Sequence, residues 1–464
     1  MGKKDTETQA NSSRFWGLLI LIVGLVVLAL FTPTILRLIP SRYVALLPEP
    51  IQELGAREHV EALPTPVPAV LSEGALEISD LILEPTQLPT VAAVATVPPA
   101  VVHTSTPDPA QLQPTFTPVP TATPTEVVPP TPTPIPFLPI ASIDNVSHQF
   151  QSWNNCGPAT LAMALSNHDI DLKQEQTADW LKPDPEDRNV SPEELVAYVR
   201  AETDLDAIMR VNGDLDTLKR FISAGLPVII ETGIDPPGDY SWLDWYGHYY
   251  LVVGYDDSEE LMYVYDSWLG SGENPQGERV NSEEGRIIEY EDLDRHWRQF
   301  NRTLIVTYES EQFETVADII GRENLDDRVM WERTLARNTQ ELEAEPENPY
   351  LWFNVGTIYN SLGDYETAAA AYDKARQLGL PWRMLWYQFG PYEAYYNTGR
   401  YADVIELADV TLFQRPYFEE SYTYRGLAKI ALGDTNPGKR DLQAAVNFNP
   451  RFQLAQDALA DLEP

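Results

Sequence analysis

The hydrophobic pattern of the chain begins with one long apolar run. Residues 15–36 (FWGLLILIVGLVVLALFTPTIL) contain no charged side chain. As a helix, this run is long enough to cross a hydrocarbon layer of about 30 Å, and no other segment of the sequence is. Because no small-x-small cleavage site comes directly after the run, an uncleaved single-pass anchor is favoured over a signal peptide. We therefore expect residues 1–14 to be cytoplasmic and residues 15–36 to form a transmembrane helix in the lipid bilayer.

The segment after this run has no helical or strand periodicity. Between about residues 63 and 139 it is low in charge and dense in proline, threonine and valine, so it cannot build a core. Such a segment prefers extended polyproline II, which rises about 3.1 Å per residue and could hold the C-terminal domains up to roughly 200 Å from the bilayer. We expect residues 37–140 to form a disordered stalk with the C-terminal domains outside the cell membrane. A disordered cytoplasmic tether is the alternative.

Globular patterning starts near residue 141, where helical and strand periodicities alternate. Ser191 to Glu194 has the features of a capping box, with Pro192 at the first helical position. The pattern predicts helices that start at Cys156 and Ser191 and at residues 214–224, and strands at residues 227–231, 249–255, 261–266 and 302–308. This mixture predicts an α+β domain over residues 141–310.

Beyond about residue 311 the pattern becomes helical and repetitive. Aromatic residues, glycines and alanines recur in three units at a spacing close to 34 residues. The first unit resembles the tetratricopeptide repeat most closely, through Trp352, Gly356, Tyr359, Gly363, Tyr365, Ala368, Tyr372 and Ala375. The sequence therefore predicts an all-α tetratricopeptide repeat solenoid over residues 311–464, in which the aromatic side chains serve packing.

The charge of the chain limits its partners. Its formal net charge of -38 argues against nucleic acid and anionic membrane surfaces as general partners, since both would repel the chain. No group of histidine, cysteine and carboxylate residues has metal-ligand spacing, and no phosphate-cradling loop is present. We expect neither a metal nor a cofactor.

Cys156 is the only cysteine in the chain and cannot form an intramolecular disulfide. It lies where a loop enters an apolar helix. A thiolate at a helix N-terminus is stabilised by unpaired backbone N–H groups and the positive end of the helix dipole, which lowers its pKa. Cys156 is therefore a candidate nucleophile. The alternative is a buried cysteine that acts as a small hydrophobic residue.

A nucleophilic thiol needs a base, and the histidines placed within reach are His148, His248 and His296. His248 opens one predicted strand and Asp266 closes the next. If these strands form an antiparallel hairpin that turns near Ser258, residue 248 lies opposite roughly residues 266 to 268. The carboxylate would then hold one imidazole tautomer and stabilise the imidazolium. Alternatively, His248 is a strand-edge histidine and Asp266 a turn residue.

The residues around these three side chains resemble the C39-like branch of the papain-type cysteine peptidases. The resemblance covers about residues 143–308 and rests on three strings: Gln151-x-x-x-Asn155-Cys156-Gly157-Pro158-Ala159, Gly247-His248-Tyr249-x-x-Val252-Val253-Gly254-Tyr255-Asp256 and Tyr265-Asp266-Ser267-Trp268. It implies a papain-like fold with Cys156 as nucleophile, His248 as general base and acid, and Asp266 as the residue that orients the base. It also implies Gln151 as a side-chain oxyanion donor beside the Cys156 backbone N–H, with Gln149 as a nearby alternative.

Together these features predict a membrane-anchored cysteine peptidase that hydrolyses peptide bonds in a peptide or protein substrate, with a repeat domain that docks another protein. Two alternatives remain: an inactive binding or assembly module, and a cysteine amidase or acyl transferase that acts on cell wall. The best-known domains of this family trim double-glycine leaders while fused to an exporter. This chain has no transporter segment and no nucleotide-binding loop, so we do not expect leader processing.

Overall fold

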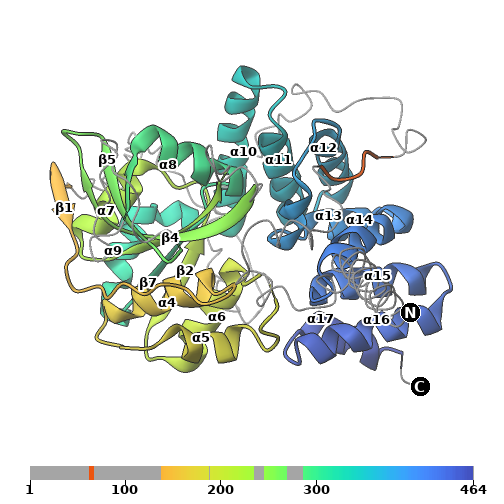
Figure 1. The fold of residues 1–464 in the computed structure, drawn as a ribbon. Coiled ribbons are helices and arrows are strands. Elements are labelled where there is room, and N and C mark those ends of the chain that lie inside the picture. Colours follow the sequence, from red (N-terminus) through yellow and green to blue (C-terminus); the bar gives the residue numbers. More distant parts are fainter. Residues whose placement is uncertain (1–61, 67–136, 188, 235–244, 269–285, 463–464) are drawn as a thin grey trace, which may run out of the picture.

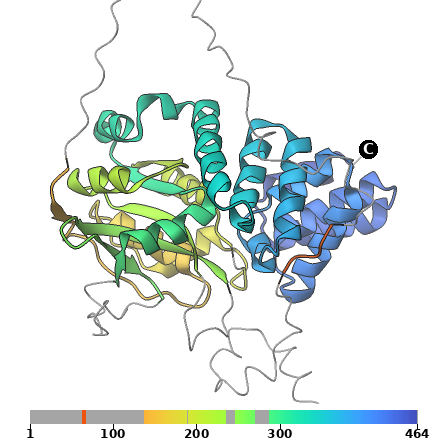
Figure 2. The ribbon, with the colours of Figure 1, turned by 90° about the horizontal axis from the view of Figure 1, so that it is seen from above.

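Two hydrophobic cores divide the described part of the chain into a sheet domain and a helical region (Figure 1). The computed structural model describes residues 62–66, 137–187, 189–234, 245–268 and 286–462. The first core takes its buried side chains from Ile143 to Ile319, and the second takes most of its side chains from Leu335 to Ala428. Seen from above, the two parts lie side by side (Figure 2).

The sheet domain is built on a seven-stranded sheet in which every pairing is antiparallel. The strand order is β2-β7-β3-β4-β5-β6, and β1 pairs with β4. The strands are β1 (Ile140–Ser142), β2 (Asp206–Arg210), β3 (Val228–Ile234), β4 (Tyr246–Asp256), β5 (Leu261–Asp266), β6 (Arg286–Glu289) and β7 (Leu304–Tyr308). Strand β4 is almost wholly buried, so its side chains are packed against other residues on both faces of the sheet.

The predicted hairpin is present as β4 and β5. Tyr250 pairs with Asp266, and the register shifts once, between Val252 and Gly254. Side chains two residues apart on a strand lie on the same face, so His248 and Tyr250 share a face and Asp266 is a diagonal neighbour of His248. The hairpin therefore brings the histidine and the aspartate to one end of the sheet, as the sequence predicts.

The helices of the sheet domain flank these strands. They are α4 (Cys156–Ser166), α5 (Gln174–Leu181), α6 (Pro192–Glu202), α7 (Leu215–Ser223), α8 (Tyr290–Trp297) and α9 (Phe313–Ile320). Helices α4, α5 and α6 lie together along one side of the strands, and α8 lies on the other side (Figure 1). The capping box of α6 is confirmed, since the Ser191 N–H donates to Glu194 Oε2 at 2.8 Å and the Glu194 N–H donates to Ser191 Oγ at 3.4 Å.

The helical region is a series of helices in which each packs on the next. They are α10 (Asp327–Ala344), α11 (Pro349–Leu362), α12 (Tyr365–Gln377), α13 (Gly390–Asn397), α14 (Tyr401–Gln414), α15 (Glu419–Ala431), α16 (Thr435–Phe448) and α17 (Gln453–Ala460). The prediction of a helical C-terminal region is confirmed. The finer assignment to tetratricopeptide repeats stays a prediction, as do the domain bounds at residues 310 and 311.

Buried and partly buried ion pairs join the two parts. Arg298 of the sheet domain donates from both Nη atoms to the Glu345 carboxylate, at 2.7 and 2.9 Å. Arg302 lies 2.7 Å from Glu341 and also binds Asp294 at 2.6 Å. Because Arg302 is buried, these contacts place α10 firmly against the end of the sheet domain.

The predicted transmembrane helix at residues 15–36 lies outside the described residues, and so does most of the predicted stalk at 37–140. Within the ranges given above, no helix has the length and apolar character needed to cross a bilayer.

Candidate active site

The thiol of Cys156 lies at the first residue of α4, directly after a tight turn. The turn is closed by a hydrogen bond from the Asn155 N–H to the Ser152 carbonyl at 3.2 Å. Asn154 adopts a left-handed conformation with φ of 56°, which asparagine tolerates better than most residues. Asn155 makes no side-chain cap hydrogen bond to α4, so its side chain does not occupy the first N–H groups of the helix. Among these groups, the Gly157 N–H is hydrogen-bonded to the Cys156 thiol.

Lys182 secures this turn from the far end of α5. Its Nζ donates to the Asn154 carbonyl at 2.7 Å and to Asn155 Oδ1 at 3.2 Å, and its side chain is buried. This residue was not predicted, because nothing in the local sequence pattern around position 182 relates it to the turn. Its position brings a fixed positive charge close to Cys156.

His248 lies on β4 with only 3 % of its surface exposed. Its Nε2 atom is 2.9 Å from Oδ1 of Asp266. Because the carboxylate occupies Nε2, Nδ1 is the nitrogen that remains for the hydrogen bond between His248 and the Cys156 side chain. The structure thus brings together the three residues that the sequence singles out, in the order cysteine, histidine and aspartate.

Asp266 is fully buried, and two groups besides His248, the Trp268 N–H and Arg286, hold its carboxylate. The Trp268 N–H donates to Oδ1 at 2.8 Å, and Arg286 Nη1 donates to Oδ2 at 3.4 Å. Arg286 also donates to the Tyr250 hydroxyl at 2.8 Å. Burial alone would raise the pKa of Asp266, but the charge and hydrogen bond of His248, with Arg286 and the Trp268 N–H, hold that pKa well below its usual range. Asp266 is therefore ionised in the folded protein.

The Cys156 thiol and the His248 imidazole each shift the pKa of the other in the direction that favours its charged form. Burial acts to raise the pKa of Cys156, yet the hydrogen bond and charge of His248, the Lys182 ammonium and the Gly157 N–H together lower it below its usual value. Burial acts to lower the pKa of His248, but Asp266 and Cys156 raise it to about 9. Both shifts favour a thiolate and imidazolium pair over the neutral thiol and imidazole; in this pair the sulfur is a nucleophile and the ring a proton donor.

The contacts of the two candidate glutamines favour Gln151 over Gln149 as an oxyanion donor. Gln149 is engaged at both ends of its amide: Nε2 donates to the Leu172 carbonyl at 2.7 Å, and Oε1 accepts from the Gln174 N–H at 3.1 Å. Gln151 accepts from the Ser267 hydroxyl at 2.8 Å, and its backbone N–H donates to the Ser267 carbonyl at 2.7 Å. The NH₂ group of Gln151 is then the part of that amide free to donate to a ligand.

The other candidate histidines have different contacts. His148 binds the backbone carbonyl of Asp266 through Nε2 at 2.9 Å, so it supports the loop rather than the carboxylate. His296 is buried on α8, and burial with the charges of Arg295 and Arg286 lowers its pKa to about 4. Neither has a contact that joins it to Cys156 in the part of the chain that the structure describes.

An aromatic residue lies beside the histidine. The Trp268 ring is 6.3 Å from His248 and 5.1 Å from Tyr246, centre to centre, and 40 % of Trp268 is exposed. Trp268 is therefore a partly exposed aromatic side chain directly beside the candidate base. Among residues 62–66, 137–187, 189–234, 245–268 and 286–462, no group of three histidine, cysteine or carboxylate side chains could hold a metal ion.

Comparisons with known proteins bear on the family of the sheet domain. No curated protein matches the chain. One solved structure, of a protein from Bacillus anthracis described as a C39-like peptidase, aligns over 37% of this chain and 98% of its own length, with 17% identity and a TM-score of 0.28. That score is too low to support a functional conclusion. Residues 143–302, which include all four predicted site residues, match the Peptidase_C39 like family, and this match supports a papain-like, cysteine peptidase-type domain in this part of the chain.

Proposed function

We propose that the chain is a membrane-anchored cysteine peptidase whose catalytic residues are Cys156, His248 and Asp266. The observation that carries the proposal is the continuous hydrogen-bonded series from the thiol through the buried imidazole to the ionised carboxylate, with 2.9 Å between His248 Nε2 and Asp266 Oδ1. A thiol with a base, and a base with an orienting carboxylate, is the arrangement that nucleophilic acyl transfer requires.

In the proposed reaction, the Cys156 thiolate attacks the carbonyl carbon of a peptide bond. The oxyanion that forms is stabilised by the Cys156 backbone N–H at the start of α4 and by the Gln151 NH₂ group. The His248 imidazolium then gives its proton to the leaving amine, and the C–N bond breaks to leave a thioester on Cys156. Neutral His248 next takes a proton from water, which attacks the thioester and releases the acid product and the thiolate.

The remainder of the chain has two further proposed roles. The uncharged run at residues 15–36 would anchor the protein in a cell membrane as a single-pass helix, with the peptidase domain on the extracytoplasmic side. The helical region would form tetratricopeptide repeats that dock a protein partner, which is supported by the repeated aromatic, glycine and alanine positions in its sequence.

Digestion of a peptide library and of a cell-wall preparation by the purified chain and its Cys156→Ala variant tests the catalytic part. We expect peptides to be cut by the wild type and left intact by Cys156→Ala. Products from cell wall alone would replace the peptidase with a cell-wall amidase, and no products from either substrate would favour an inactive binding module.

Protease shaving of intact cells tests the orientation. External protease should remove or degrade residues 137–462 if the domains are displayed outside. Survival of both domains in intact cells, with digestion after lysis, would contradict extracytoplasmic display.

A further inference from the structure

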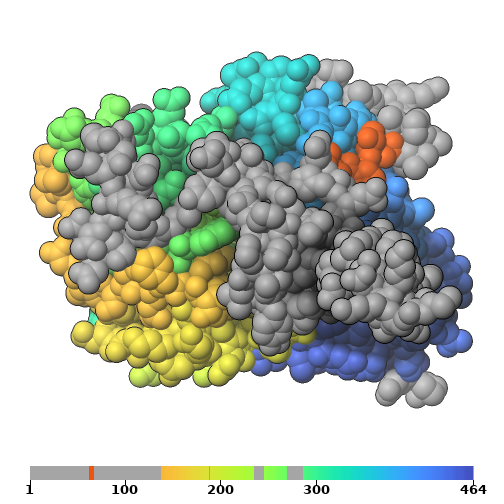
Figure 3. Space-filling model, viewed as in Figure 1, coloured from red at the N-terminus to blue at the C-terminus, as the bar shows by residue number. Residues whose placement is uncertain are grey.

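A short piece of the proline-rich linker lies on the helical region. Residues 62–66 (Ala-Leu-Pro-Thr-Pro) form the small orange segment on the surface of that region, far in sequence from every neighbour (Figures 1 and 3). Leu63 is only 3 % exposed and belongs to the second hydrophobic core, and Pro66 is also buried. The linker thus supplies a core side chain to a region that starts more than two hundred residues later.

Two hydrogen bonds fix the backbone of this segment. The Leu63 N–H donates to the Leu380 carbonyl at 3.0 Å, and Arg376 Nε donates to the Pro64 carbonyl at 2.8 Å. Leu380 comes after Gly379, which takes a left-handed φ of 88° where α12 ends, and precedes a proline. A residue before proline is biased to extended backbone, so the Leu380 carbonyl is presented outward, as at the edge of a strand.

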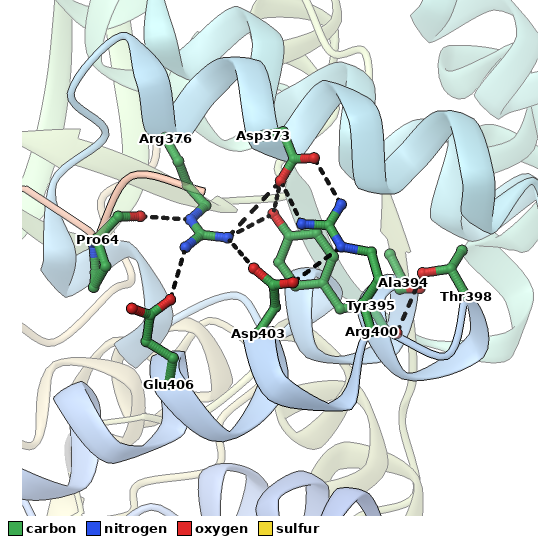
Figure 4. Close-up of polar contacts among 9 residues, drawn as sticks. All are labelled: Pro64, Asp373, Arg376, Ala394, Tyr395, Thr398, Arg400, Asp403 and Glu406. Atoms are coloured by element: carbon green, nitrogen blue, oxygen red, sulfur yellow. Dashed lines mark hydrogen bonds and ion pairs between the residues drawn. The ribbon is translucent and has the colours of Figure 1, made fainter. Parts of the chain in front are cut away.

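Arg376 is held in place for this contact by its other donors. Its guanidinium is buried and donates to the Tyr395 hydroxyl and to Asp403 Oδ1, both at 3.2 Å, and to Glu406 Oε2 at 3.4 Å (Figure 4). With both Nη atoms engaged, Nε is the donor left to face the linker carbonyl. Because the arginine is buried and fixed in this way, its Nε–H group is already positioned to bind a peptide carbonyl.

The contacts define which peptide fits. The site binds one N–H group and the carbonyl of the next residue, and it buries the leucine side chain between them. A proline after the leucine brings no N–H group that would be left unpaired, and its fixed φ pre-sets the extended backbone. Thr65 is exposed, so the position between the two prolines is free to vary. The ligand class is therefore an extended Leu-Pro-x-Pro segment.

We infer that the helical region carries a binding site for extended Leu-Pro-x-Pro segments, and that residues 63–66 of this chain occupy it as an intramolecular ligand. The inference rests on the docking role proposed above and names the peptide class that would dock. A tethered segment has an effective concentration of about millimolar, so a partner peptide must displace it to bind. The same motif occurs once more in the linker, as Leu47-Pro48-Glu49-Pro50.

Occupation of this site also changes the reach of the predicted stalk. If residues 15–36 span the membrane, only residues 37–62 lie between the bilayer and the helical region. As polyproline II, at about 3.1 Å per residue, these would span about 80 Å, compared with roughly 200 Å for the predicted stalk without this attachment.

Binding of a fluorescent peptide with the sequence of residues 60–68 to the full chain in detergent tests this inference. Every chain carries Cys156→Ala, so the readout does not involve peptidase chemistry. The Leu63→Asp chain should bind the peptide at least about tenfold more tightly than the parent, because its own segment no longer competes. The matched Leu47→Asp chain should behave as the parent does, and a peptide with aspartate in place of its leucine should not bind.

Equal peptide binding by the parent and Leu63→Asp chains, or no binding by either, would overturn the inference. Tighter peptide binding by the Leu47→Asp chain in place of the Leu63→Asp chain would also overturn it. Hydrogen exchange of the segment around Leu63 gives a second measurement that needs no substitution. Its amide should be protected in the wild-type chain, and exchange at the rate of an unstructured peptide would contradict occupation of the site. Neither result depends on whether Cys156 cleaves peptides.

Discussion

Tyr387 of the helical region packs its ring against the backbone of Gly247, the residue before His248: a Cβ at Gly247 would lie only 2.9 Å from ring atoms. Two residues earlier, Trp245 stacks on Tyr350 and meets Tyr387 edge-on, each at 5.9 Å between ring centres. The helical region therefore supports the end of β4 that carries His248. It contributes to the geometry of the candidate site in addition to any docking role.

Replacing Gly247 with alanine tests this support. The added methyl group must displace either Tyr387 or β4, so we expect a loss of about 1–3 kcal/mol in the free energy of unfolding. A shift of His248 relative to Cys156 should also lower kcat/KM by roughly tenfold or more. Urea denaturation and steady-state kinetics measure the two effects.

The Gly247→Ala, Tyr387→Ala double variant is the matched control, because removal of the ring makes room for the methyl group. It should recover part of the lost activity relative to Gly247→Ala alone. Full activity in Gly247→Ala, or no recovery in the double variant, would show that the Tyr387 contact does not position His248.

Lys182→Met should make the thiolate form of Cys156 less favourable. The ammonium of Lys182 helps to lower the pKa of Cys156, so its removal shifts that pKa upward. The acid limb of the pH profile of kcat/KM should move to higher pH, with activity at pH 6 lowered roughly three- to tenfold. Lys173→Met is the control, because Lys173 is exposed on the surface, 3.8 Å from Asp171. Overlapping acid limbs in wild type and Lys182→Met would count against this role.

Arg286→Gln should destabilise the fold and reduce turnover. Asp266 is fully buried, and loss of the Arg286 charge leaves its carboxylate less compensated. Breaking a buried ion pair by removal of one partner costs about 3–5 kcal/mol, so a large shift in the urea midpoint is expected. Arg295→Gln removes an exposed arginine on α8, which pairs with Asp292 at the surface, and should change the midpoint little. Equal midpoints for the two variants would contradict the importance of the Arg286 contact.

The proposed Cys156–His248 pair predicts how activity should depend on pH. The reactive form needs deprotonated Cys156 and protonated His248, so activity should rise as pH passes the lowered pKa of Cys156. It should fall again as pH passes about 9, where His248 loses its proton. Asp266→Asn removes the main charge that raises the pKa of His248, so the alkaline limb should move to lower pH. An alkaline limb that is identical in the two proteins would exclude His248 as its source.

The sequence predicted the parts of the site that depend on local patterns. Cys156 lies at a loop-to-helix boundary, and the β4–β5 hairpin has alternating strands with an acidic turn, so the proximity of His248 and Asp266 could be inferred from chain order. Tyr250 could have been placed in the same way, because it lies two residues after His248 on one face of a strand.

Other parts of the site could not be predicted in this way. Lys182 and Arg286 reach the site from α5 and β6, and their roles depend on tertiary contacts that leave no periodic signal. The short strands β2 and β6 were missed because five and four residues of mixed polarity do not establish a period of two. The choice between Gln149 and Gln151 needed hydrogen-bond partners, since spacing along the chain does not separate them.

Alkylation of Cys156 by iodoacetamide, measured as a function of pH in the wild type and in His248→Ala, tests the central claim most directly. Cys156 is the only cysteine, so the incorporated label reports on that thiol alone. We predict that the wild type reacts at least about tenfold faster than His248→Ala at pH 6.5, and that the two rates converge above the pKa of a free thiol. Equal rates at pH 6.5 would contradict an activated Cys156–His248 pair.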